Sequence, residues 1–167
     1  CKYSGLGKSM PTTRYLIATR LIRLAWLATL SIGLFASPAM ADIYIRQGAT
    51  GSGSGADWTN ACTGFSGNCA VSAFARPDTV WVADGSYSSV IFNRATSGTA
   101  TITVRKATQA SHGTETGWDT TYGDGTSAFT FFTVSTDYWV LDGFEITGGG
   151  QLNDVTGANN QVLNNTF

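Results

Sequence analysis

The chain has 167 residues, a length that allows one domain, and a formal net charge of −1. Residues 1–41 hold five of its ten basic residues and none of its eleven acidic ones. Residues 42–167, with the other five basic and all eleven acidic residues, therefore carry a net charge of −6. Such a surface repels phosphate backbones, which argues against a nucleic-acid partner.

Residues 10–41 have the pattern of a secretory signal. Three arginines precede the uncharged apolar run 24–36, and Ala39-Met40-Ala41 places small residues where a signal peptidase reads. The alternative is a membrane anchor, but this apolar run is shorter than the roughly 20 residues that a spanning helix needs.

This signal predicts a secreted, periplasmic or cell-surface protein that is not embedded in a membrane after cleavage. Residues 1–9 precede Met10 and are interpreted as an upstream extension, either non-native or a gene-calling artefact.

Residues 42–76 are predicted to form a strand, a loop and a cap. Asp42–Arg46 alternates in polarity, with Ile43 and Ile45 on one face, and a Gly/Ser-rich linker follows over residues 48–55. A short helix near Val71–Phe74 is expected to cover the open end of a strand stack.

Cys62 and Cys69 lie close together in a loop of this segment. In an exported protein such a pair favours a local disulfide. A metal site is the alternative, but His112, the single histidine, is far away in the sequence, so we expect no metal in this chain.

Residues 77–167 hold short β-type runs separated by turns, without a helical period. Residues 107–127 are polar and Gly/Thr-rich and are predicted to be an insertion loop. The predicted strands are 79–83, 90–92, 99–106, 129–134, 138–141, 144–147 and 161–167, with a hinge at Asp142-Gly143.

A spacing of about 22 residues recurs among these strands. It places Val80 opposite Ile102, and Val140-Leu141 opposite Val162-Leu163. A period of this size indicates a solenoid, in which each coil buries its apolar face against its neighbours. An antiparallel β-sandwich is the alternative, because it also has short strands and frequent turns.

Four segments carry a resemblance to a known family. They are D-T-V-W-V-A-D-G-S-Y at 78–87, I-T-V-R-K-A at 102–107, Y-W-V-L-D-G-F-E-I-T-G at 138–148 and N-N-Q-V-L-N-N-T-F at 159–167. They resemble the opening coils of right-handed parallel β-helix proteins of the pectin-lyase-like superfamily. The resemblance covers residues 42–167 and implies an all-β solenoid, of which this chain holds the N-terminal cap (42–76) and the first coils (77–167).

The resemblance also implies structural roles for asparagines and a truncated chain. Asn159, Asn160, Asn164 and Asn165 fit the family's habit of stacking asparagines inside a turn, although ordinary turn chemistry would explain them equally. Because the last predicted strand has no cap, we expect this chain to be poorly soluble by itself.

For function, the resemblance implies action on extracellular acidic polysaccharide by lyase-type β-elimination, with the active site in coils beyond this chain. The alternative is a non-catalytic surface or adhesion β-helix that binds glycans. No catalytic residue can be named. No cofactor is evident, although Ca²⁺ could bind in the later coils.

Few residues are candidates for ligand contact. Arg105-Lys106 could hold a substrate carboxylate, but a solvated strand end facing acidic neighbours is the favoured interpretation. Trp118 and Tyr122 lie in the polar insertion loop and are candidate sugar contacts, with packing of the loop onto the stack as the alternative. Trp81 and Trp139 are expected to be buried within strands.

Overall fold

The computed structural model describes residues 40–148 and 154–167. The signal predicted for residues 10–41 therefore lies outside the described residues except at Met40 and Ala41, and it stays a prediction. None of the helices in the described part of the chain is long and apolar enough to cross a membrane.

The protein is all-β, and its described residues form three parallel sheets. Sheet A has the order β1-β2-β5-β8-β10, sheet B the order β3-β6-β9, and sheet C pairs β4 with β7. The strands are β1 (Asp42–Ile45), β2 (Thr79–Val82), β3 (Gly85–Tyr87), β4 (Val90–Phe92), β5 (Ile102–Lys106), β6 (Ser127–Phe129), β7 (Phe132–Val134), β8 (Trp139–Asp142), β9 (Glu145–Ile146) and β10 (Gln161–Leu163). Every named strand pair is parallel, which excludes the antiparallel β-sandwich.

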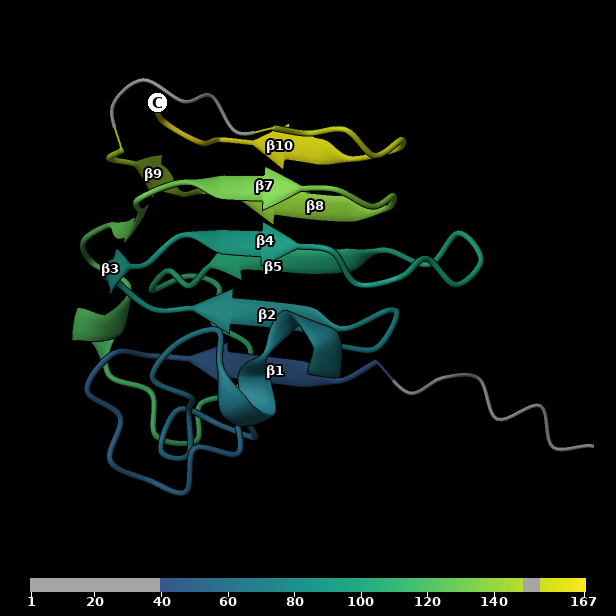
Figure 1. Ribbon diagram of the computed structural model, residues 1–167. Coiled ribbons are helices and arrows are strands. Elements are labelled where there is room, and N and C mark those ends of the chain that lie inside the picture. Colours follow the sequence, from purple (N-terminus) through teal and green to yellow (C-terminus); the bar gives the residue numbers. More distant parts are fainter. Residues whose placement is uncertain (1–39, 149–153) are drawn as a thin grey trace, which may run out of the picture. The chain divides into compact units, whose positions relative to one another are not determined.

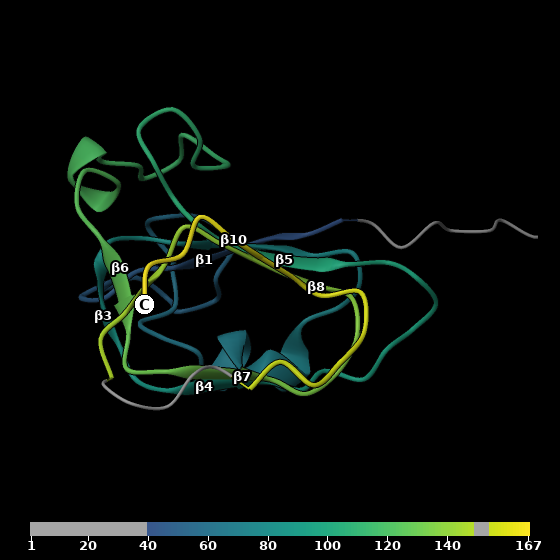
Figure 2. The same ribbon diagram turned by 90° about the horizontal axis from the view of Figure 1, so that it is seen from above.

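From β2 onward the chain visits the sheets in a fixed order. It passes through A, B and C as β2-β3-β4, again as β5-β6-β7, and continues through β8 and β9. Val155 then bridges Val134 of sheet C before β10 returns to sheet A. Figure 1 shows the strands as successive layers, and Figure 2, from above, shows the sheets on different sides of a common interior.

The interior is filled by apolar side chains that repeat from layer to layer. In sheet A one such ladder joins Ile43, Val80, Val104, Leu141 and Val162. Val80, Val104 and Leu141 are fully buried in the main core, and the two end members pack against it. The β-branched residues that favour strands thus also bury each layer against the next.

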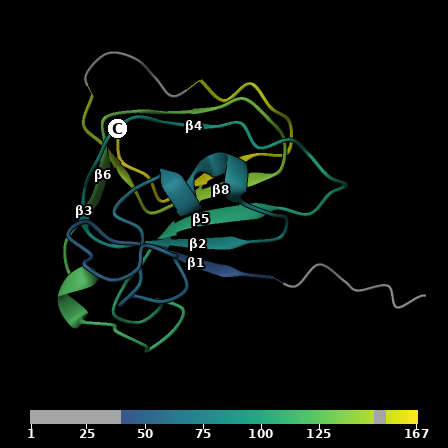
Figure 3. The same ribbon diagram turned by 60° about the horizontal axis from the view of Figure 1, so that its bottom comes forward.

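In the described part of the chain, three short 3-10 helices accompany the strands: η2 (Gly67–Cys69), η3 (Val71–Ala73) and η4 (Thr120–Tyr122). Val71 and Phe74 belong to the main core, and Phe65 packs against it. Figure 3, with the bottom of the molecule forward, shows η2 and η3 lying across the space between sheet A and β4. The helix expected near Val71–Phe74 is therefore present as η3.

The structure corrects the register expected from the sequence. Val80 pairs with Val104 and not with Ile102, and Val162 pairs with Leu141 and not with Val140. The run 129–134 is also divided between β6 and β7, which lie in different sheets, because the chain turns a corner at Thr130 and Phe131.

Candidate functional site

One row of aligned residues crosses the outer face of sheet A. Tyr44 pairs with Trp81, Trp81 with Arg105, and Arg105 with Asp142. Alternate residues of a strand point to opposite faces, and the neighbours of these residues fill the main core. The row therefore faces away from that core.

Arg105 is the exposed cation of this row. Its guanidinium carbon lies 5.0 Å from the centre of the Trp81 ring, within cation–π range. Its Nη2 lies 3.6 Å from Asp142 Oδ2, and the two side chains are 38% and 21% exposed. Arg105 Nε is buried and has no hydrogen-bond partner among the described residues, so a ligand would meet the guanidinium at its Nη groups. A pair this long and this exposed contributes little, so the guanidinium is available to another anion.

The insertion loop covers the neighbouring end of the face. Trp58, which is fully buried, contacts Tyr44, Trp118 and Tyr122, with ring centres 4.9, 5.0 and 6.2 Å away. A Cβ added at Gly113 would lie 2.8 Å from Trp81 Nε1, which shows how closely the loop backbone approaches the row. Burial and then the charge of Asp42 raise the pKa of Tyr44 to about 12.

The structure places Trp118 and Tyr122 in this aromatic cluster, where both stay partly exposed. The His112 ring stacks on Trp118 with a centroid distance of 4.0 Å. His112 Nε2 lies 2.9 Å from Glu115 Oε1, and Nδ1 lies 3.2 Å from the Thr108 carbonyl oxygen. The Arg46 guanidinium carbon lies 4.5 Å from the centre of the Tyr122 ring. These contacts hold the loop on the sheet.

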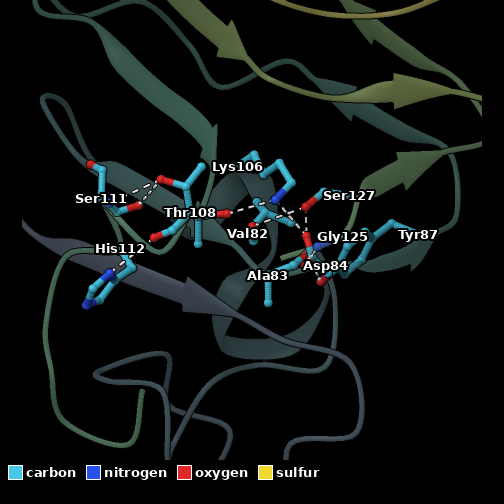
Figure 4. Close-up of polar contacts among 11 residues, drawn as sticks. Val82, Ala83, Asp84, Tyr87, Lys106, Thr108, Ser111, His112, Gly125 and Ser127 are labelled. Carbon is cyan, nitrogen blue, oxygen red and sulfur yellow. Dashed lines mark hydrogen bonds and ion pairs between the residues drawn. The ribbon is translucent and has the colours of Figure 1, made fainter. Parts of the chain in front are cut away.

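Lys106, next to Arg105, is committed to a different contact. Its Nζ lies 2.7 Å from Asp84 Oδ1 and donates to the Ala107 carbonyl at 3.0 Å. Asp84 Oδ2 in turn accepts from the backbone N–H of Gly125. Figure 4 shows Lys106 and Asp84 pointing toward one another. This pair ties together the two ends of the insertion loop and is only slightly exposed.

Two hydroxyl groups complete this corner. Ser127 Oγ and Tyr87 Oη both donate to the Ala83 carbonyl, at 2.8 and 2.9 Å. Ser127 is fully buried, and burial raises the pKa of Tyr87. The Lys106–Asp84 pair and these two hydroxyl groups therefore join the end of β2 with β5 and β6 at this corner.

The asparagines predicted to be structural join adjacent layers. Asn160 accepts from the Trp139 N–H at 2.9 Å and donates to the Thr136 carbonyl at 3.0 Å. Asn165 repeats the pattern with Phe144 N–H at 2.7 Å and Leu141 carbonyl at 2.9 Å.

The asparagine before each of these residues makes the turn itself. Asn159 and Asn164 have left-handed backbones, with φ of 58° and 53°. Asn164 also donates to Asp142 Oδ1 at 2.8 Å.

The structure also tests the predictions for the cysteines and for the tryptophans within strands. Cys62 and Cys69 form the predicted disulfide. Trp139 is fully buried and Trp81 is 8% exposed, so their burial within strands is confirmed. Within residues 40–148 and 154–167 no group of three or more His, Cys, Asp or Glu side chains is placed to hold a metal ion.

In the sequence Trp81, Arg105 and Asp142 are far apart and share no pattern. Their alignment depends on the register between β2, β5 and β8, and the insertion loop separates β5 from β8. Comparison with family models, with curated proteins and with solved structures gives no match for this chain.

Proposed function

We propose that this chain forms the cap and first coils of an exported right-handed parallel β-helix that binds extracellular acidic polysaccharide on the outer face of sheet A. The observation that carries the binding site is the half-exposed Arg105 guanidinium lying over Trp81 and only loosely paired with Asp142.

The fold part of this proposal is supported by the order in which the chain visits its sheets. Each circuit through sheets A, B and C places a new strand beside its predecessor in the same sheet. Parallel pairing of successive circuits with a repeated interior is what a solenoid requires. The asparagine contacts between layers support the same arrangement, because they recur at the same offset from Asn160 and Asn165.

The ligand part rests on charge. Residues 42–167 have a net charge of −6, so a polyanion can approach only where a cation is locally accessible. Arg105 offers a planar donor group that matches a uronate carboxylate. Trp118 and Tyr122 lie on the adjoining loop, where an exposed ring edge can contact a neighbouring sugar.

Two activities of the whole protein would use such a contact. In lyase-type β-elimination a base removes the proton next to the uronate carboxylate, and the bond to the glycosidic oxygen breaks to leave a C=C bond. In an adhesion protein the polysaccharide is only held. Lys106 is already paired with Asp84, so the described outer face supplies a carboxylate contact and no available amine base.

Electrophoresis of the processed protein through native gels containing polygalacturonate tests this proposal. We expect retardation by polygalacturonate but not by dextran, and loss of most of that retardation in Arg105→Gln. Arg94→Gln is the matched control, because Arg94 is exposed and donates to the Ser72 carbonyl away from sheet A.

Equal retardation of wild type and Arg105→Gln would refute the site, and no retardation in any gel would refute the ligand class. The ultraviolet absorbance of unsaturated products, followed with pectate, alginate and chondroitin, distinguishes the lyase from the adhesion protein.

A further inference from the structure

A groove that differs chemically from the Arg105 site lies away from sheet A. It runs between the loop and cap segment 63–72 and the stretch 87–93, which includes β4, and it has a volume of about 570 Å³. This volume falls within the range of about 300–1,000 Å³ that is usual for small-ligand sites.

None of the residues lining this groove is charged. Its floor is apolar, since Val71, Tyr87 and Val90 are buried there and Phe65 is partly buried. Its exposed rim carries hydroxyl and amide side chains, namely Thr63, Ser66, Ser72, Ser88, Ser89, Asn93 and Gln47.

Most of these rim groups are free to bind a ligand. Within the described part of the chain, the side chains of Thr63, the four rim serines and Asn93 form no hydrogen bond with other protein groups. Gln47 differs, because its amide is bonded to the backbone N–H and carbonyl of Ser86.

The groove walls are also held in place. The Cys62–Cys69 disulfide closes the loop that forms one wall, and Phe65 anchors this loop among core rings, with Phe92 5.8 Å and Phe129 5.6 Å away. Arg94 Nη1 donates to the Ser72 carbonyl at 2.8 Å and ties the two walls together. A fixed groove loses little conformational entropy when a ligand binds.

We infer that this groove binds a segment of a neutral oligosaccharide. Sugar rings present apolar C–H faces to a floor of this kind and hydroxyl groups to a rim that can both donate and accept. The groove differs from the Arg105 site because no cation lines it. A carboxylate or phosphate in the groove would lose its hydration without gaining a counter-charge, so the groove disfavours anionic ligands. On this inference the protein has two glycan sites, one at Arg105 for acidic sugars and one in the groove for neutral sugars.

Isothermal titration of the processed protein with cellohexaose, xylohexaose, mannohexaose and maltohexaose tests this inference, with hexagalacturonate as the charged counterpart. We expect at least one neutral hexasaccharide to bind. Ser72→Trp places an indole in the groove from an exposed position and should weaken that binding at least tenfold. Ser89→Ala, which removes a single hydroxyl, should weaken it by about three- to tenfold.

Ser97→Trp is the matched control, since Ser97 is exposed and does not line the groove. It should bind the neutral ligand as wild type does, and so should Arg105→Gln. If no neutral hexasaccharide binds, or if Ser72→Trp binds it unchanged, the inference is wrong. Loss of neutral binding in Arg105→Gln would also overturn it, because both ligands would then share one site.

Discussion

Arg76 offers the sharpest test of what holds the layers together. Its side chain is 8% exposed and donates to five backbone carbonyls on three stretches of chain. The shortest of these bonds are to Tyr138 at 2.7 Å, Asp137 at 2.8 Å and Ala100 at 3.0 Å. Its guanidinium carbon also lies 5.4 Å from the centre of the Trp139 ring.

We predict that Arg76→Met lowers the free energy of unfolding by about 3 kcal/mol. Three short hydrogen bonds contribute about 1 kcal/mol each, and the ring contact adds about 0.5–1 kcal/mol. Burial opposes this gain, and it also lowers the pKa of Arg76. Arg76→Lys keeps the charge but not the planar array of donors, so it should cost about half as much.

Urea unfolding followed by tryptophan fluorescence measures this difference. Arg94→Met is the matched control, because Arg94 is exposed and its side chain bonds only the Ser72 carbonyl among the described residues. This variant should cost less than about 1 kcal/mol. An Arg76→Met variant within 1 kcal/mol of wild type would show that the carbonyl contacts of Arg76 do not hold these layers.

Other predictions concern the asparagine contacts, the disulfide and alkaline pH. Asn165→Ala should lower the free energy of unfolding by about 2 kcal/mol, because it removes the bonds to Phe144 and Leu141, whereas Asn93→Ala should leave it unchanged; equal stability of the two variants in urea would contradict this. Reduction of Cys62–Cys69 should cost about 2.5 kcal/mol by loss of loop closure, and the double Ser variant should not respond to reductant. The pKa of Tyr44 is raised from 10.0 to about 12, so the fold favours its protonated form; this stabilisation is complete below pH 10 and is lost as the pH rises toward 12. Tyr44→Phe should show a shallower loss of unfolding free energy over that interval, and a slope equal to that of wild type would exclude Tyr44 as its source.

The strands were predictable because their information is local. β2 and β5 have alternating β-branched residues, and these residues fill the core as expected. The register was not predictable from this pattern. Between β2 and β5 a slip of two residues keeps the same residues inward, so alternation cannot detect it.

Between β8 and β10 the error was a single residue, which exchanges the two faces of a strand. Side chains outside the alternating pattern distinguish the two registers. Asn160 accepts from Trp139 N–H at the start of β8, and Asn165 accepts from Phe144 N–H just after its end. These bonds fit the register that places Val162 beside Leu141. In the sequence the same asparagines are equally consistent with ordinary turns.

For the outer-face site, individual residues could be proposed from the sequence, but their arrangement could not. Arg105 was a recognisable candidate for contact with a carboxylate, but its placement over Trp81 depends on strand register. The packing of Trp118 and Tyr122 depends on Trp58, which comes from a distant loop with no pattern of its own. Arg76 gave no signal at all, because its partners are backbone carbonyls that any residues would supply.

The central claim is that Arg105 on the outer face of sheet A binds an acidic glycan. Nitrogen-15 NMR of the processed protein titrated with hexagalacturonate tests this binding, because a carboxylate held at the Nη groups of Arg105 also changes the Nε–H signal of the same guanidinium. We predict that the Arg105 Nε–H and Trp81 indole N–H signals shift together and saturate with ligand. Unchanged signals from both groups at millimolar hexagalacturonate would contradict the claim.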